Sequence, residues 1–136
     1  CKSDVMYKGA LLSSGARSVW IGDVLVRKEA IGTDTHQVNR NLLLSQGARA
    51  DSVPNLELET GEIIKAGHAS ATGRFDDEQV FYLQSRGIPL EAARQLVVRG
   101  FFAEVLGRIG NEAWRDELLT KISQRLGINT FEGDDE

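Results

Sequence analysis

The sequence has a single cysteine, Cys1, among its 136 residues. One thiol cannot close an internal disulfide, and it cannot build a zinc or iron–sulfur site without another chain. The sequence also lacks any apolar run near the roughly 18 residues needed to cross a bilayer, and no charged-then-apolar leader opens it. We therefore expect a soluble, cytoplasmic protein with no membrane partner.

Basic residues form no stripe and do not alternate with aromatic residues, so nothing predicts a nucleic-acid partner. The net charge is −4, and residues 74–136 hold twelve acidic side chains against eight basic ones. Four of the acidic residues fall in the last eight positions. We interpret residues 129–136 as a flexible acidic tail rather than a binding element.

Motifs that carry catalysis are also missing. The sequence contains no HExxH, GxxxxGK[ST] or GxSxG motif, and no GxGxxG motif after a strand. Asp76 and Asp77 are better explained as residues at a helix N-terminus, where they complement the dipole, than as an acid/base pair. We therefore predict that the chain is not an enzyme on its own.

Residues 1–73 predict strands with no helix between them. Apolar residues come in short bursts, separated by turn-forming residues, over 5–12, 19–26, 38–44 and 56–64. Val19-Trp20-Ile21 is apolar on both faces, which predicts burial on each side. Strands joined only by turns can form an antiparallel sandwich or the rungs of a parallel β-solenoid, and periodicity does not choose between them.

Residues 74–128 predict three helices. A capping box, Asp76 with Gln79, begins a short helix over 77–86. Pro89 begins a second, which runs to about residue 109, and a third follows as far as residue 127. The second helix is apolar around most of its circumference. It must therefore lie wedged between the strands and the other helices, or dock partly on another protein.

Two histidines remain as candidate ligands. His36 follows Thr33-Asp34-Thr35, which we interpret as a polar turn with a solvated histidine. His68 lies in the small-residue stretch GHASATG, where the backbone is poorly shielded. Imidazole is a common ligand for transition metals, including iron in clusters where histidine replaces cysteine. From the residues alone, His68 is either such a ligand or a hydrogen-bonded residue at a joint between strands and helices.

Several stretches strongly resemble the C-terminal part of the SufB/SufD scaffold family, and SufD more closely than SufB. They are NRNLLLS (39–45), PNLEL (54–58), GHASATG (67–73), DDEQVFYL (76–83) and SRG (85–87), in the family's order and spacing over about residues 7–126. The resemblance implies a fold that is mainly β with α: a right-handed parallel β-helix, with its last rungs in residues 1–73, followed by a helical segment, 74–128. It also implies a fragment of a longer scaffold, whose exposed rung a second copy could cover by self-association.

The resemblance further implies a SufD-like, non-catalytic scaffold subunit of the SufBCD complex. That complex assembles a transient iron–sulfur cluster at the SufB–SufD interface. In SufD-like members the histidine of the GH(A/G) stretch lies at this interface, and here that position is His68, the implied metal ligand. SufB-like members supply a cysteine and a glutamate where this chain has Asn39 and Ala69. The chain would thus share the cluster with a SufB-like subunit and bind none tightly alone.

The resemblance also gives the short helix a partner, the ATPase SufC. Gln79, Tyr82 and Arg86 stand where the family makes this contact, and aromatic and arginine side chains are apt interface anchors. Phe81 either joins the contact or packs the helices on the last rung. Two other functions stay open: a β-solenoid interaction module without cluster chemistry, and a carbohydrate-active β-solenoid enzyme, although the clustered carboxylates of such an enzyme are not found.

Overall fold

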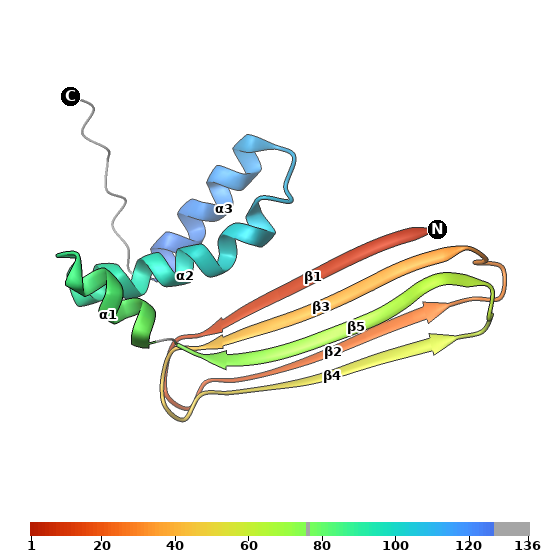
Figure 1. Ribbon diagram of the computed structural model, residues 1–136, viewed down its shortest axis with the longest axis horizontal. Helices are drawn as coiled ribbons and strands as arrows, with labels where there is room; N and C mark the ends of the chain where they lie inside the picture. Colours follow the sequence, from red (N-terminus) through yellow and green to blue (C-terminus); the bar gives the residue numbers. More distant parts are fainter. Residues whose placement is uncertain (76, 127–136) are drawn as a thin grey trace. The chain divides into compact units, whose positions relative to one another are not determined.

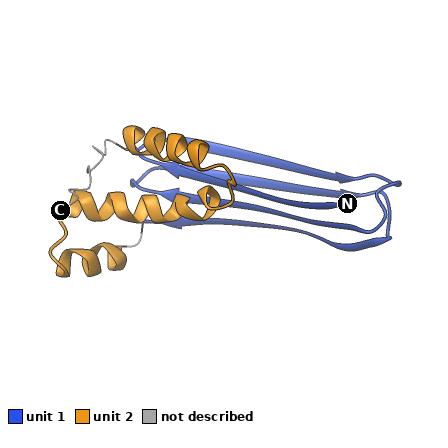
Figure 2. Cartoon of the chain, turned by 90° about the horizontal axis from the view of Figure 1, so that it is seen from above, with its two compact units in different colours: residues 1–75 blue, residues 76–136 orange. Residues whose placement is uncertain are grey.

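The computed structural model describes residues 1–75 and 77–126, in which five strands are followed by three helices (Figure 1). The chain divides into two compact units, residues 1–75 and residues 76–136 (Figure 2). The strands make up the first unit and the helices the second. The acidic tail predicted at 129–136 lies outside the described residues.

The first unit contains two parallel sheets built from alternating strands. One sheet has the order β1 (Lys2–Leu11), β3 (Thr33–Leu43), β5 (Ile63–Arg74), and the other pairs β2 (Arg17–Val26) with β4 (Arg49–Leu58). Each strand therefore pairs with the second strand along the chain. Met6 pairs with Val38 and Trp20 with Ser52, both 32 positions apart. Because every pair is parallel, the antiparallel sandwich left open by the sequence is excluded for these strands.

The turns at one end of this unit repeat with the same spacing. Gly15 and Gly47 have φ values of 79° and 82°, in the left-handed region that glycine adopts without steric penalty. In both turns the next residue's N–H donates to the carbonyl three positions back, at 3.1 Å for Ala16 and 3.3 Å for Ala48. The Arg49 N–H then donates to the Ala16 carbonyl at 2.9 Å. The two turns are therefore stacked in the same way as the strands they connect.

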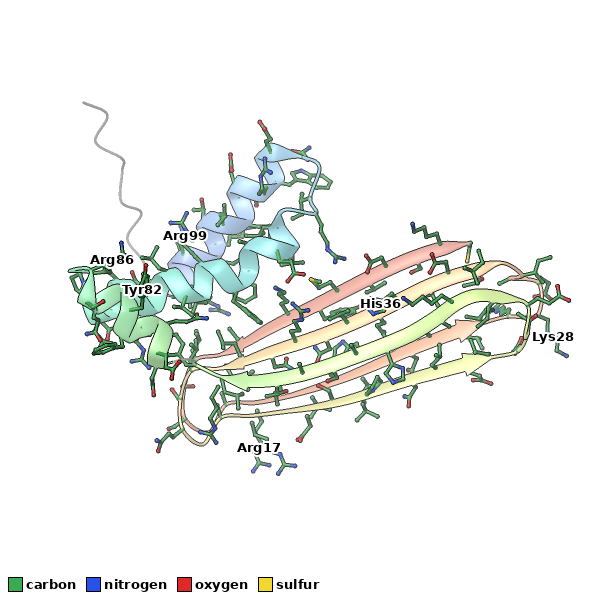
Figure 3. The ribbon with its side chains drawn as sticks, viewed as in Figure 1. Arg17, Lys28, His36, Tyr82, Arg86 and Arg99 are labelled. Atoms are coloured by element: carbon green, nitrogen blue, oxygen red, sulfur yellow. The ribbon has the colours of Figure 1, made fainter. Side chains whose placement is uncertain are left out.

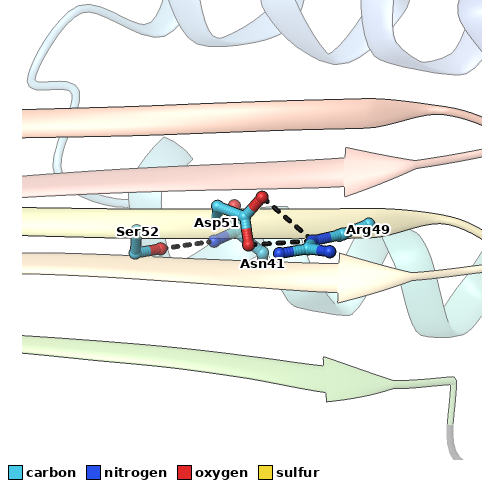
Figure 4. Close-up of polar contacts among 4 residues, drawn as sticks. All are labelled: Asn41, Arg49, Asp51 and Ser52. Atoms are coloured by element: carbon cyan, nitrogen blue, oxygen red, sulfur yellow. Dashed lines mark hydrogen bonds and ion pairs between the residues drawn. The ribbon is translucent and has the colours of Figure 1, made fainter.

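Polar side chains of β3 line the space between the two sheets. Five alternate residues of the strand are each at most 5% exposed: Thr33, Thr35, Gln37, Asn39 and Asn41. The Ser52 hydroxyl of β4 donates to Asn39 Oδ1 at 2.7 Å, so this face of β3 points at the second sheet. Figure 4 shows the neighbouring contact, in which Asn41 Nδ2 donates to the same hydroxyl at 3.3 Å. The interior of the unit is consequently polar over most of the length of β3.

The structure corrects several strand predictions. Residues 33–36 begin β3 and form no turn, so His36 is an exposed residue of a strand (Figure 3). The apolar burst over 56–64 holds the end of β4 and the start of β5, and residues 59–62 between them belong to neither strand. Residues 67–73 lie inside β5 and not at a joint. Burial of Val19 and Ile21 is also wrong, since they are 65% and 63% exposed on the outer face of β2.

The helices lie close to their predicted positions. They are α1 (Asp77–Ser85), α2 (Leu90–Leu106) and α3 (Glu112–Arg125). Asn111 caps α3, because its Oδ1 accepts a hydrogen bond from the Trp114 N–H at 3.2 Å. Asp76, one half of the predicted capping box, lies outside the described residues. No helix in residues 77–126 is long and apolar enough to cross a membrane.

The helical unit leaves several large side chains exposed. On α2 the residues Ala93, Val98 and Leu106 are buried, so the helix has a packed face. On α3 two large apolar side chains are exposed, Trp114 at 66% and Leu118 at 40%. A surface pair also lies on this helix: Lys121 Nζ donates to Glu117 Oε1 at 2.6 Å, and this contact holds the pKa of Glu117 below its ordinary value.

Candidate functional site

The strand that carries His68 lies at the edge of its sheet. β5 has one neighbour, β3, in the sheet that the structure describes, and β4 is at the edge of the second sheet. The backbone N–H and C=O groups along the outer side of an edge strand are open to pairing with another chain. Stretch 67–73 of β5 contains only glycine, alanine, serine and threonine besides His68. Few bulky side chains therefore obstruct this edge.

His68 lies on the face of β5 that points between the sheets. Paired residues of a parallel sheet have their side chains on the same face, and His68 pairs with Gln37, which is buried on the inner face of β3. His68 itself is exposed, which its position at the sheet edge explains. The imidazole therefore belongs to the interior face and is still within reach of a molecule that approaches the edge.

The interior layer that contains His68 also contains Gln37, the Trp20 ring and Gly22. Gln37 lies between Val5 of β1 and His68 of β5 in the register of the first sheet. It also approaches Gly22 of β2 so closely that a Cβ at this glycine would lie 2.6 Å from Gln37 Nε2. Gly22 pairs in turn with Pro54 of β4. In this layer the side chains are therefore closely packed beside Gly22 of β2, whereas His68 of β5 is exposed.

Asn39 and Ala69, the positions for which the resemblance implies a cysteine and a glutamate in SufB-like members, have different surroundings. Asn39 is 2% exposed, and its Oδ1 already accepts hydrogen bonds from Asn41 Nδ2 at 2.8 Å and from Ser52. Ala69 follows His68 on the strand and so points to the opposite face. Neither position adds a ligand beside His68.

His68 has no companion ligands in the described part of the chain. Within residues 1–75 and 77–126, no group of three or more His, Cys, Asp or Glu side chains could hold a metal ion. Cys1 is exposed, and its Sγ lies 3.5 Å from Thr33 Oγ1 at the start of β3. A metal site of three or more such ligands that included His68 would need ligands from outside these residues.

The second set of predicted residues lies on one exposed side of α1 and on Arg86, the residue that follows it. Gln79, Tyr82 and Arg86 are spaced by three and four residues and are all exposed, whereas Val80 is buried. The Arg86 guanidinium carbon lies 4.9 Å from the centroid of the Tyr82 ring, a cation–π contact that holds the two together (Figure 3). Phe81, the neighbour of Tyr82 in the sequence, is 73% exposed.

Sequence reasoning missed Gln37. Two signals could have found it: polar residues occupy every second position from Thr33 to Asn41, which is the period of a strand, and Gln37 precedes His68 by 31 positions. The repeat of the glycine turns, at 32 positions, is close to that spacing.

The first unit is thus built of strands that alternate between two parallel sheets, with an exposed histidine on an edge strand. The family model described as SUF system FeS cluster assembly, SufBD core domain, matches residues 1–101. The chain belongs to this SufBD family of iron–sulfur cluster assembly proteins.

Curated relatives agree with this membership. An iron–sulfur cluster assembly SufBD family protein of Mycobacterium tuberculosis is 62% identical over 134 residues, covering 94% of this chain and 34% of the relative. SufD of Escherichia coli is 37% identical over 126 residues, and SufD of Bacillus subtilis 34% over 121, covering 93% and 89% of this chain and 29% and 28% of theirs. The predicted family is confirmed, and the chain spans about a third of the length of these relatives.

Proposed function

We propose that this chain is the part of a SufD-like, non-catalytic scaffold subunit at which iron–sulfur clusters are assembled together with a SufB-like subunit, in a SufBCD complex. The observation that carries the proposal is the position of His68, exposed on the interior face of an open edge strand within the SufBD core domain. A cytoplasmic location is part of the proposal.

The proposal includes a right-handed parallel β-helix, with its last rungs in residues 1–73 and a helical subdomain in residues 74–128. Alternation of the strands between two parallel sheets, the 32-residue register and the stacked turns at Gly15 and Gly47 support it. A solenoid of this kind buries its rungs by stacking them on one another. A crystal structure of the whole subunit with the strands in another order would overturn this part.

The SufB-like partner is proposed to approach the edges of β4 and β5. Open strand edges are common sites of pairing between chains, because main-chain hydrogen bonds supply affinity. At this edge an imidazole nitrogen of His68 donates its lone pair to iron of the nascent cluster, and the partner supplies the remaining ligands. The cluster is transient cargo and is not held by this chain alone.

The ATPase SufC is proposed to bind the surface formed by Gln79 and Tyr82 of α1 and by Arg86, which follows the helix. Rearrangement driven by ATP hydrolysis would then open the interface to iron and sulfide. The exposed ring of Phe81, next to this face, adds apolar surface of the kind that protein interfaces bury.

Replacing Tyr82 or Arg86 by alanine is expected to weaken SufC binding about 30-fold, the effect of losing one interface hot spot of about 2 kcal/mol. Gln79→Ala should weaken it less, by about fivefold. Titration of the purified subunit with SufC, by calorimetry, measures all three variants. Gln84→Ala is the matched control for Gln79, since Gln84 is an exposed glutamine of the same helix that lies off this face. Equal binding by the Tyr82, Arg86 and control variants would contradict the assignment.

Anaerobic co-purification tests the proposal as a whole. The subunit, expressed with a SufB-like protein and SufC, should elute as one complex that develops the visible absorbance of iron–sulfur clusters when iron and sulfide are supplied. A complex that forms but never gains this absorbance would favour an interaction module without cluster chemistry, and turnover on a glycan panel would favour a carbohydrate-active enzyme. Sedimentation of the chain alone shows whether it self-associates.

A further inference from the structure

Gln37 has a buried oxygen with no hydrogen-bond partner. Its side chain is 5% exposed, and nothing among residues 1–75 and 77–126 donates a hydrogen bond to Oε1. Leaving a buried acceptor unsatisfied costs about 1–3 kcal/mol, so such groups usually have a partner in the working state of the protein. The polar residues further along the same face are satisfied: Asn39 and Asn41 bond to each other and to Ser52.

The neighbours of Gln37 explain why this oxygen is unpaired. Val5, its partner on β1, has no polar side chain, and Gly22, which it touches on β2, has no side chain at all. Pro54, paired with Gly22, has no N–H group to donate. On the remaining side, the register places His68 directly beside Gln37 and on the same face. The Trp20 ring also lies against Gly22 and carries an indole N–H, but it donates no hydrogen bond to Gln37 Oε1. His68 is the other neighbour whose side chain can donate an N–H.

We propose that Gln37 is a positioning residue for His68: Gln37 Oε1 accepts a hydrogen bond from one ring nitrogen of His68 and so fixes which nitrogen keeps its lone pair. The exposed ring has room to turn about its side-chain torsions toward β3. The inference rests on the proposed ligand role of His68.

The hydrogen bond prepares the imidazole for metal binding. A neutral imidazole has one N–H and one lone pair, and the bond made by the first decides which nitrogen offers the second. Histidine ligands commonly donate their other N–H to a carbonyl oxygen, and loss of such a partner lowers metal affinity or activity 10- to 100-fold. Here the interior carbonyl of Gln37 would hold the N–H inward, and the lone pair would point outward from the open edge.

The tautomer of His68 tests the inference without any cluster. In the ¹⁵N-labelled chain, long-range ¹H–¹⁵N spectra, recorded about two units above the ordinary imidazole pKa of ~6.5, report the two ring tautomers. His36 is the other histidine of the sequence and is exposed on the opposite face of β3, so it serves as an internal reference. The ratio of the two tautomer populations should be about ten times larger for His68 than for His36, because a hydrogen bond of ordinary net strength changes such a ratio by about this factor.

Gln37→Leu removes the acceptor at nearly constant volume and should bring the tautomer ratio of His68 to that of His36, whereas Gln37→Glu should keep the preference. If the leucine variant does not fold, Gln37→Met replaces it. A ratio in the unmodified chain equal to that of His36, or one unchanged in the leucine variant, would overturn the inference.

The cluster yield of the whole complex separates this inference from the proposed function. Gln37→Leu should lower the yield at least tenfold. If instead His68→Ala leaves the yield normal, the ligand role is refuted, while a tautomer preference that depends on Gln37 would still establish the hydrogen bond.

Discussion

Cluster formation is expected to stop when His68 is replaced by alanine in a reconstituted complex with a SufB-like subunit and SufC. The imidazole is the one metal-ligating side chain of this chain on the interior face of the edge strand β5, among the residues described. Its loss removes a ligand that no neighbour can replace, because Asn39 is occupied by two hydrogen bonds and Ala69 faces the other way. Visible absorbance and acid-labile sulfide of the anaerobically reconstituted complex measure the yield.

His36→Ala is the matched control for this substitution. Both histidines are exposed residues of adjacent strands, but His36 pairs with Gly67 and so lies on the outer face. Substitutions at exposed positions usually change stability by no more than about 0.5 kcal/mol, so both variants should fold and still bind SufC. Cluster yield should remain normal for His36→Ala. A normal yield for His68→Ala would refute the role proposed for this residue.

The helices could be predicted closely from the sequence because their signals are local. Pro89 and Asn111 mark helix starts through backbone geometry and capping, and both act within a few residues of their own position. Tertiary packing had little influence on where these elements begin. The degree of exposure, as at Trp114, could not be predicted in the same way, since it depends on packing between elements far apart in the sequence.

The strands were predicted less well because the interior of the first unit is polar. The usual signal of a half-buried strand is an apolar residue at every second position, whereas β3 has threonine, glutamine and asparagine there. Its first residues therefore look like a turn. The small residues of β5 likewise look like a loop, although parallel pairing with β3 extends over residues 63–74. Neither the start of β3 nor the strand over residues 63–74 can be predicted without knowing which strand lies beside it.

The candidate site likewise contains residues that could be found from the sequence and one that could not. His68 and the face of α1 were found through the resemblance to a family, not through a local pattern, and their roles remain proposals. Gln37 emerged only from the coordinates, because its relation to His68 depends on a strand register that spans 31 residues. A residue that acts on a ligand from the next strand has no signature in the sequence around the ligand.

The polar interior leads to the second large effect: Asn39→Ala should destabilise the protein by about 2–4 kcal/mol. Asn39 is 2% exposed, and its Oδ1 accepts from Asn41 Nδ2 at 2.8 Å and from Ser52 Oγ at 2.7 Å. Alanine would leave both donors short of an acceptor inside the unit and add a small cavity. Since a domain of this size is typically stable by only 5–15 kcal/mol, urea unfolding should show a clearly lower midpoint.

Asn55→Ala distinguishes burial from the mere loss of an asparagine hydrogen bond. Asn55 Nδ2 donates to Asp23 Oδ1 at 2.7 Å between β4 and β2, but this pair is exposed and water can replace it. The change should therefore cost no more than about 0.5 kcal/mol. If Asn39→Ala were equally mild, the buried amides would not stabilise the stacked strands. Their retention in place of apolar side chains would then have to be explained by the chemistry at the open edge, where Gln37 meets His68.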